Sequence, residues 1–347
     1  MDAGLGLRLC AILLTAVFIV SCAPSGVTTK DEGASPDPVM GDWYGHIVTK
    51  TGEVKPVVAQ AIALGGGSYR FVSQTEFDRR DPLGDYPFSK VMFDGNLEGD
   101  RIAVAQFPDW SVSIANGVIR GRPSGTDVDR FELKHIVRLS PCLGATPPPG
   151  ATVLFDGTSL AGWERRDPKQ RETPAGWSIS DGIFQVVPGT GDIMTKQKFT
   201  DFRLHIEFRT PFMPEAREQA RGNSGVYLQG RYEVQVLDSY GLSGEDNECG
   251  GIYKISAPRV NMCAPPGQWQ SYDITFYAPR FDGSGTKTRD ASVTVLHNGI
   301  EIHGGLVLPG VTGGAVDEDV KSPGPLLLQD HGNLVQYRNV WLVEMSR

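Results

Sequence analysis

The sequence lacks several features that would point to common classes of protein. Acidic residues outnumber basic ones, 41 against 33, and the net charge of -8 argues against a nucleic-acid partner, whose binding depends on neutralising phosphates. No two cysteines have the C-x-x-C spacing typical of zinc or redox sites. The glycine run 65–67 is not followed by the Lys-Ser/Thr pair of a phosphate-binding loop, so we expect no nucleotide or flavin cofactor.

Residues that interrupt helices are abundant, because 42 of the 347 residues are Gly and 24 are Pro. In a helix interior these residues cost about 1 and 3 kcal/mol, so the composition predicts short strands joined by turns. A hydrophobic content of 40% is too high for a disordered chain. We therefore expect an all-β protein of one large or two unequal domains.

The amino terminus predicts export. The apolar run 9–20 is about a dozen residues long, too short to span a bilayer and typical of a secretory signal, residues 1–21. Its end, Ile19-Val20-Ser21-Cys22, resembles a bacterial lipobox, which implies that Cys22 carries lipid; an ordinary signal peptide is the alternative. We expect a lipid-anchored protein of the bacterial cell envelope, at the outer membrane and facing the periplasm. Residues 22–39 are predicted to form a flexible tether.

Three cysteines remain once Cys10 leaves with the signal and Cys22 is lipidated. In an oxidising compartment Cys249 and Cys263 are predicted to form a disulfide, closing a loop worth about 3 kcal/mol in the chain-entropy model. Cys142 is expected to be free.

Two strand-rich regions follow. Between residues 40 and 140, short apolar runs are separated by Asp94-Gly95 and Asn116-Gly117, which are hairpin turns because these residues accept positive φ. This region is predicted to be a small antiparallel barrel or sandwich. Residues 141–150 contain three consecutive prolines and are predicted to be a stiff linker, which leaves residues 151–347 as a second domain.

The second domain contains strands in which polar and apolar residues alternate strictly. In the segment 203–209, Glu207 and Arg209 have the opposite parity to the apolar residues, and in the segment 232–237 Glu233 and Gln235 do. Alternation with a period of two places one set in a core and the other on the opposite sheet face. The pattern predicts an antiparallel sandwich with one polar sheet face.

Motifs in order along residues 152–347 resemble a known family. They are Leu154-Phe155-Asp156-Gly157, Gly162-Trp163, Asp201-Phe202-Arg203-Leu204, Gly222-Asn223-Ser224-Gly225-Val226, Tyr232-Glu233-Val234-Gln235-Val236-Leu237-Asp238-Ser239, Gly251-Ile252-Tyr253, Gly267-Gln268-Trp269-Gln270, Leu328-Gln329-Asp330-His331-Gly332 and Arg338-Asn339-Val340-Trp341. Together they are similar to the 3-keto-disaccharide hydrolase domain, catalogued as domain of unknown function 1080. The region before it is similar to a small β domain of some bacterial members.

This resemblance implies a concanavalin A-like jelly roll that cleaves glycosides oxidised at carbon 3. The ketone acidifies the hydrogen on carbon 2, so a modest base can remove it and the glycosidic oxygen can leave by elimination, after which water adds. Such chemistry needs a base, a proton donor and stabilisation of an enolate. The implied catalytic residues are Glu207, Glu233 and His331. A divalent metal of unknown identity would be held by Glu233 and His331, and the implied substrate-binding residues are Arg209, Asn223, Gln235, Asp238, Tyr253 and Arg338.

Two alternatives stay open. Ordinary glycosidases of the same fold need two carboxylates about 5 Å apart, and the Glu-x-Asp-x-x-Glu run of some of them is absent. A non-catalytic sugar-binding lipoprotein is the other, since a fold does not determine a function. The expected partners are an oxidised glycoside and a membrane reached through the lipid anchor, and the oligomeric state is open.

Overall fold

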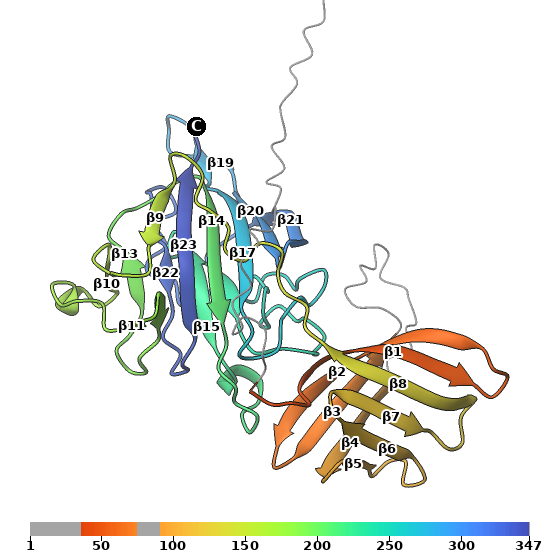
Figure 1. Ribbon diagram of the computed structural model, residues 1–347. Helices are drawn as coiled ribbons and strands as arrows, with labels where there is room; N and C mark the ends of the chain where they lie inside the picture. The colour runs from red at the N-terminus through yellow and green to blue at the C-terminus, as the bar shows by residue number, and fades with distance from the viewer. Residues whose placement is uncertain (1–35, 75–90, 347) are drawn as a thin grey trace, which may run out of the picture.

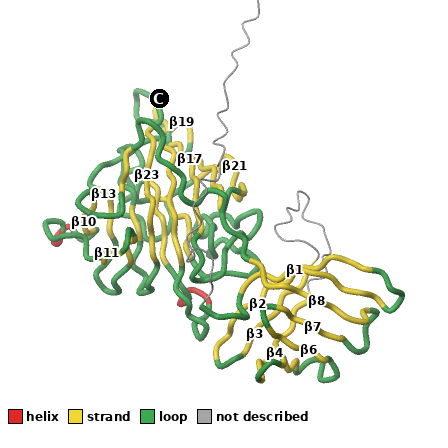
Figure 2. The backbone as a smooth tube through the Cα atoms, in the orientation of Figure 1, coloured by secondary structure: helices red, strands yellow, loops and turns green. Residues whose placement is uncertain are grey.

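The chain folds into two β domains that lie side by side (Figure 1). The computed structural model describes residues 36–74 and 91–346; the predicted signal segment 1–21 and Cys22 lie outside them. Helix in the described residues is confined to two single turns, η1 (Pro168–Gln170) and η2 (Glu218–Ala220) (Figure 2). No described helix has the length and apolar character needed to cross a membrane. The all-β prediction is confirmed.

The first domain is a closed antiparallel barrel, so the open choice between barrel and sandwich is resolved. Closure comes from β1, which pairs with β2 on one side and with β8 on the other. The strands are β1 (Gly41–Thr49), β2 (Val54–Gly65), β3 (Ser68–Gln74), β4 (Val91–Glu98), β5 (Arg101–Val104), β6 (Ser111–Ala115), β7 (Val118–Arg122) and β8 (Val128–Ile136).

The second domain is a sandwich of two antiparallel sheets, consistent with the predicted jelly roll. The five-stranded sheet, to which we give the name front sheet, has the order β10 (Trp163–Arg165), β13 (Ile193–Thr195), β22 (Leu327–Leu328), β15 (Ser224–Leu228) and β16 (Tyr232–Val236). The back sheet has the order β11 (Ser178–Ser180), β12 (Ile183–Gln185), β23 (Gln336–Glu344), β14 (Phe202–Arg209), β17 (Gln270–Tyr277), β20 (Ala291–His297) and β21 (Ile300–Leu308), with β9 (Thr152–Phe155) paired to β23. A small hairpin joins β18 (Arg280–Phe281) and β19 (Lys287–Arg289).

The hydrophobic core lies between the two sheets, as the strand alternation predicts. Val234 and Val236 of the front sheet are fully buried in it, as are Ile206 and Phe208 of the back sheet. The ring of Tyr232 on β16 contacts that of Phe276 on β17 at a centroid distance of 5.4 Å. Each sheet therefore turns its other face outward, and the polar residues of the alternating strands lie on these two outer faces.

The topology of the front sheet gathers residues that are distant in sequence. The two-residue strand β22 lies between β13 and β15. This order brings the segments near residues 192, 227 and 329 next to one another, and β16 completes the sheet beside β15.

Polar contacts hold the two domains together. The Tyr240 hydroxyl donates to Asp42 Oδ1 at 2.6 Å, and Asp42 also pairs with Arg138 at 2.7 Å. Arg221 of the sandwich donates to the carbonyl of Ala63 at 3.1 Å. These contacts use one end of the barrel, the end that holds residues 39–42, 60–65 and 138.

Candidate active site

The structure does not bring the two predicted catalytic carboxylates together. Glu207 lies on β14, in the back sheet, and Glu233 lies on β16, in the front sheet. Both side chains point away from the core, which in a sandwich is about 10 Å thick. The single polar face expected from the sequence is therefore two faces on opposite sides of the domain.

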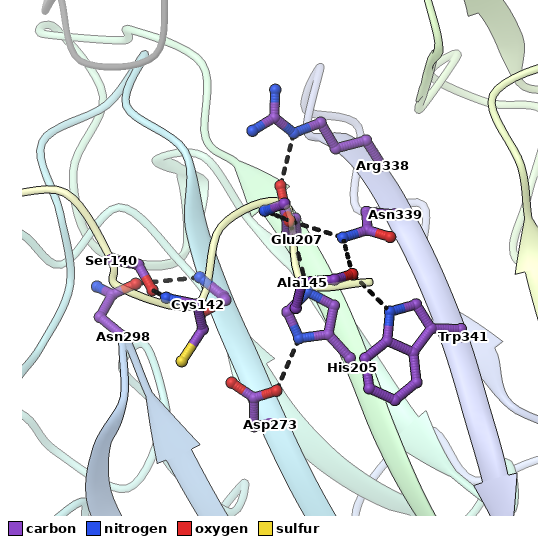
Figure 3. Close-up of polar contacts among 12 residues, drawn as sticks. Ser140, Cys142, Ala145, His205, Glu207, Asp273, Asn298, Arg338, Asn339 and Trp341 are labelled. Atoms are coloured by element: carbon purple, nitrogen blue, oxygen red, sulfur yellow. Dashed lines mark hydrogen bonds and ion pairs between the residues drawn. The ribbon is translucent and has the colours of Figure 1, made fainter. Parts of the chain in front are cut away.

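Glu207 is completely buried beneath the linker between the domains (Figure 3). Its Oε1 accepts from the backbone N–H of Gly144 at 2.6 Å and from Asn339 Nδ2 at 2.9 Å, and its Oε2 accepts from Arg338 Nε at 2.6 Å. His205 Nε2 lies 3.4 Å from Oε1. Every oxygen of this carboxylate has a partner within the protein.

His205 extends this cluster into a buried charge network. Its Nδ1 lies 2.7 Å from Asp273, and its ring stacks on Trp341 at 5.1 Å. Burial opposes the charge of His205, but its hydrogen bonds to Asp273 and Glu207 raise its pKa to about 9. Burial likewise opposes the charge of Glu207, yet the bond to His205 and the charge of Arg338 lower its pKa to about 2.

The cluster fastens the linker to the back sheet. The carbonyl of Ala145 accepts from Asn339 at 3.0 Å and from the Trp341 indole at 3.2 Å, and the Ser140 hydroxyl contacts that of Ser271 at 2.8 Å (Figure 3). The linker, predicted from its prolines to be a stiff spacer, is thus docked along the sheet at residues 140–145.

Two predicted substrate-binding residues also belong to the back sheet. Arg209 and Arg338 lie over the ring of Trp269, at 4.7 and 4.2 Å from its centroid. Arg209 Nε also donates to Gln336 Oε1 at 2.7 Å. The structure places both arginines with Glu207 rather than with Glu233.

Glu233 has a different environment on the front sheet. It is 3% exposed and lies opposite Tyr227 in the β15–β16 register. Burial raises its pKa to about 8; a hydrogen bond from the Tyr227 hydroxyl opposes this shift, and the negative charge of Asp192 adds to it. A Cβ at Gly225 would lie 2.3 Å from Glu233 Oε1, so only glycine leaves room for the carboxylate.

A glycine-rich segment, residues 309–316, covers Glu233, and we call it the roof loop. The Thr312 hydroxyl accepts from the backbone N–H of Glu233 at 2.9 Å, and the Tyr227 hydroxyl lies 3.1 Å from the carbonyl of Gly313, so it can direct its one hydrogen either to that carbonyl or to Glu233. Arg166 donates to the carbonyl of Ala315 at 2.8 Å. The roof loop is therefore fixed to both sides of the carboxylate.

Asp192 and Asp330 connect the segments near residues 166, 191 and 330 at the edge of the site, which we call the rim. Asp192 Oδ2 pairs with Arg166 at 2.9 Å, and its Oδ1 accepts from the backbone N–H of Asp330 at 2.9 Å. Asp330 Oδ2 accepts in turn from the N–H of Gly191 at 2.9 Å. The predicted catalytic residue His331 follows Asp330 and is exposed, which places it at the rim, whereas Glu233 is buried.

Three amide side chains form a polar group next to Glu233. Gln219 Oε1 accepts from Gln235 Nε2 at 3.0 Å and from Asn223 Nδ2 at 3.2 Å. Asn223 Oδ1 and Gln235 Oε1 are buried and have no hydrogen-bond partner among the described residues. An unmet buried acceptor costs about 1–3 kcal/mol, so this group is suited to a hydroxyl donor.

The remaining predicted residues are divided. Tyr253 is half-buried, and its ring lies 3.7 Å from where a Cβ of Gly313 would stand, so it flanks the roof loop. Asp238 forms a buried ion pair with Arg221 at 2.7 Å, in the arginine's contact with the barrel, and is not beside Glu233.

The cysteine predictions were wrong. Cys249 and Cys263 are both free and buried, with Cys249 Sγ 3.2 Å from the Tyr272 hydroxyl and Cys263 Sγ donating to the Leu237 carbonyl. Their thiols hydrogen-bond to each other. Spacing in the sequence could bring them into contact but could not decide their oxidation state. Cys142, expected to be free, is disulfide-bonded.

The residues present do not fit the expected metal. The described part of the chain holds no group of three or more His, Cys, Asp or Glu side chains able to hold a metal ion. The two proposed ligands differ in setting: Glu233 is buried under the roof loop, whereas His331 is exposed.

Comparison with known proteins identifies the family of the domain that carries this site. A model of the 3-keto-α-glucoside-1,2-lyase-like domain matches residues 150–343, more than half of the 347 residues. The chain belongs to this family. The resemblance drawn from the sequence motifs is thereby confirmed.

A solved structure agrees with this family. One from Parabacteroides distasonis, provisionally described as a glycosyl hydrolase, is 41% identical over 57% of this chain and 85% of that chain, with a TM-score of 0.52. A second from the same organism, described in the same way, is 20% identical, covers 57% of this chain and 95% of its own, and has a TM-score of 0.42. No curated protein matches the chain. The carboxyl-terminal domain is thus related to glycoside-cleaving enzymes.

Sequence reasoning missed Tyr227, Asp192 and Gln219. Tyr227 has the same parity as Gly225 on β15, so it could have been found once β15 was paired with β16. Asp192 and Gln219 carry no such signal, because only the order of strands and loops brings them to the site.

Proposed function

We propose that the carboxyl-terminal domain cleaves glycosides whose sugar carries a ketone at carbon 3. The observation that carries the proposal is the buried Glu233 in a domain of this family. Its carboxylate lies beside a tyrosine hydroxyl, and its pKa is raised to about 8. A base works best when its pKa is near the working pH. Most of the other side chains and backbone groups next to Glu233 carry no charge, so the site is suited to binding a neutral sugar.

The proposed reaction begins with proton removal. The Glu233 carboxylate takes the proton from carbon 2, and the electrons of that bond form an enolate with the carbon 3 oxygen. Tyr227 stabilises the negative charge by donating its hydroxyl hydrogen to the oxygen that carries the charge, on Glu233 or on carbon 3. Burial keeps the pKa of Tyr227 above the usual range, so its hydroxyl stays protonated. Asn223 and Gln235 accept from sugar hydroxyls through their unpaired oxygens.

Elimination completes the cleavage. The enolate electrons form a double bond between carbons 1 and 2 and expel the glycosidic oxygen, which receives a proton from His331 at the rim. As the hydroxyl of a water molecule adds to carbon 1, His331 takes that water's proton, and Glu233 returns its own proton to carbon 2. The net reaction is hydrolysis, and both side chains regain their starting protonation. Because Glu233 is 3% exposed, the proposal requires the roof loop to open for the sugar.

The test is to incubate the protein with a 3-keto glycoside and with its unoxidised parent, and to measure the released alcohol. We expect release from the keto substrate alone, and a slower rate when carbon 2 carries deuterium. Glu233→Gln and His331→Ala should each lower turnover at least ~100-fold, the scale of a lost acid or base.

Glu344→Gln is the control, since Glu344 lies at the end of β23 in the back sheet and its side chain is exposed. It should leave turnover within about twofold, as expected for a surface residue remote from the chemistry. Release from the parent sugar would favour an ordinary glycosidase. Binding without release from either compound would favour a sugar-binding protein.

A further inference from the structure

The amino-terminal barrel contains a cavity of about 380 Å³. Eight-stranded barrels are just wide enough for their side chains to fill them or for one small ligand to be held. Here the wall carries two small side chains at the same height, because Ala59 of β2 pairs with Ser73 of β3 and both line the cavity. The interior is therefore left open where larger residues would close it.

Aromatic rings from β3, β4 and the segment after β5 line the cavity beside these small residues. The ring of Phe93 stacks on Phe71 at 5.2 Å and meets Trp110 edge-on at 5.6 Å, and Trp110 stacks on Phe107 at 4.3 Å. Phe107 is 37% exposed even though it lines the cavity, so the apolar interior is reached from solvent. An apolar surface kept accessible in this way is typical of a binding site.

The cavity extends from the barrel interior to the end that is remote from the sandwich domain. Its wall includes Ile47 and Val57, which flank the β1–β2 turn, and residues 126–128 at the start of β8. The opposite end, near Asp42 and Ala63, carries the contacts with the sandwich. A molecule in the barrel is therefore distant from Glu233 and is not the sugar of the proposed reaction.

The lining residues define the kind of ligand. Among the described residues that line the cavity, Asp127 is the one charged side chain, and none is Lys, Arg or His. A ligand carboxylate or phosphate would find no cation among these described residues and would approach an aspartate. A dry apolar cavity of about 150 Å³ holds benzene, so the volume here suits about two rings or a medium-length hydrocarbon chain.

We propose that the barrel binds one uncharged, largely apolar small molecule, independently of the sandwich domain. The inference does not depend on the proposed enzymatic function. It assigns to the first domain a role in capturing apolar compounds, which can be measured without any glycoside.

The experiment titrates the whole protein with N-phenyl-1-naphthylamine, a neutral dye whose fluorescence rises in apolar surroundings. We expect saturable binding at one site. 2-Naphthol and 1-dodecanol should displace the dye, and dodecanoate should do so at least ~10-fold less well because of its charge. A lower displacing concentration for 2-naphthol identifies an aromatic ligand, and a lower one for 1-dodecanol an acyl ligand.

Ser73→Leu fills the cavity and should weaken dye binding at least ~10-fold, with Ala59→Val giving a smaller loss. Ser113→Leu adds the same side chain at an exposed position of β6 and should bind like the wild type. Circular dichroism confirms that each variant is folded. The proposal is overturned if the wild type shows no saturable binding, if folded Ser73→Leu and Ala59→Val bind normally, or if dodecanoate competes as well as 1-dodecanol.

Discussion

The protonation of Glu233 is set by three neighbours of different character. Burial raises its pKa, Asp192 adds to the rise, and the Tyr227 hydroxyl lowers it again by donating to the carboxylate. The hydroxyl can be removed by a nearly isosteric change. The Tyr227 side chain therefore offers a direct way to shift the pH at which the proposed base becomes active.

Tyr227→Phe should raise the pKa of Glu233 further above 8, because the anion loses a donor. A hydrogen bond to a charged group contributes about 1.5–3 kcal/mol, which corresponds to about one to two pH units. If Glu233 is the base, kcat/KM increases with pH as the carboxylate ionises, and this limb should move to higher pH by that amount. The measurement is a pH–rate profile with a 3-keto glycoside.

Tyr277→Phe is the matched control, since Tyr277 lies at the end of β17 and is 42% exposed. Its profile should coincide with that of the wild type. A limb that stays in place in Tyr227→Phe, or that moves to lower pH, would contradict the role given to the hydroxyl.

At the level of elements, the roof loop depends on its glycines. Gly314 has φ +78°, where a side chain is strained, and a Cβ there would lie 2.6 Å from the Tyr227 hydroxyl. Gly314→Ala should therefore displace either the loop or Tyr227. We expect a loss of stability of about 1–2 kcal/mol, the cost of a left-handed non-glycine residue, and a fall in kcat/KM of about tenfold.

Gly310→Ala, in the same loop, should have little effect, because a Cβ there meets nothing within 4 Å. Thermal unfolding and steady-state kinetics compare the two variants. If both variants have the same thermal stability and kcat/KM, the roof loop can accommodate a Cβ at residue 314, contrary to this prediction.

Strand alternation predicted much of each element but not how the elements combine. It placed Glu233 and Gln235 on one face of β16 and Val234 on the other, as observed. It could not tell that Glu207 lies on a different sheet, because the outer faces of both sheets show the same pattern. That information resides in the order of strands, which non-local pairing determines.

The family motifs have the same limit. They identified the residues that the fold keeps in place, and these include both Glu233 at the proposed site and Glu207 in the linker cluster. A motif in one sequence does not distinguish a residue that reacts from one that holds a segment. Burial and hydrogen-bond partners distinguish the two. Both oxygens of Glu207 accept hydrogen bonds, whereas the amide oxygens of Asn223 and Gln235 near Glu233 have no partner among the described residues.

For the whole molecule, the cluster around Glu207 determines how the domains are joined. It fixes residues 140–145 of the linker to the back sheet, while the contacts of Asp42 with Tyr240 hold the other side. The two proposed sites, in the barrel and under the roof loop, thus lie on one frame that these contacts hold together. Weakening the cluster should loosen this frame before it unfolds either domain.

Glu207→Gln keeps the shape of the side chain and removes the charge that faces His205 and Arg338. Loss of one partner from a buried ion pair costs about 3–5 kcal/mol. The pKa of Glu207 is lowered from 4.5 to about 2 in the folded protein, so its stabilisation is present above pH 4.5 and lost as the pH falls towards 2. That of His205 is raised from 6.5 to about 9, so its stabilisation is present below pH 6.5 and lost as the pH rises towards 9.

The wild type should therefore exceed Glu207→Gln in thermal stability most strongly between about pH 4.5 and 6.5, with a smaller difference on either side. Glu132→Gln, which alters an exposed ion pair with Arg120 at 2.9 Å, is the control and should cost at most about 1 kcal/mol at any pH. Limited proteolysis provides a second measurement, because a released linker is cut between residues 141 and 150 while both domains remain intact. If Glu207→Gln matches Glu132→Gln in both measurements across the pH range, the cluster does not hold the domains together.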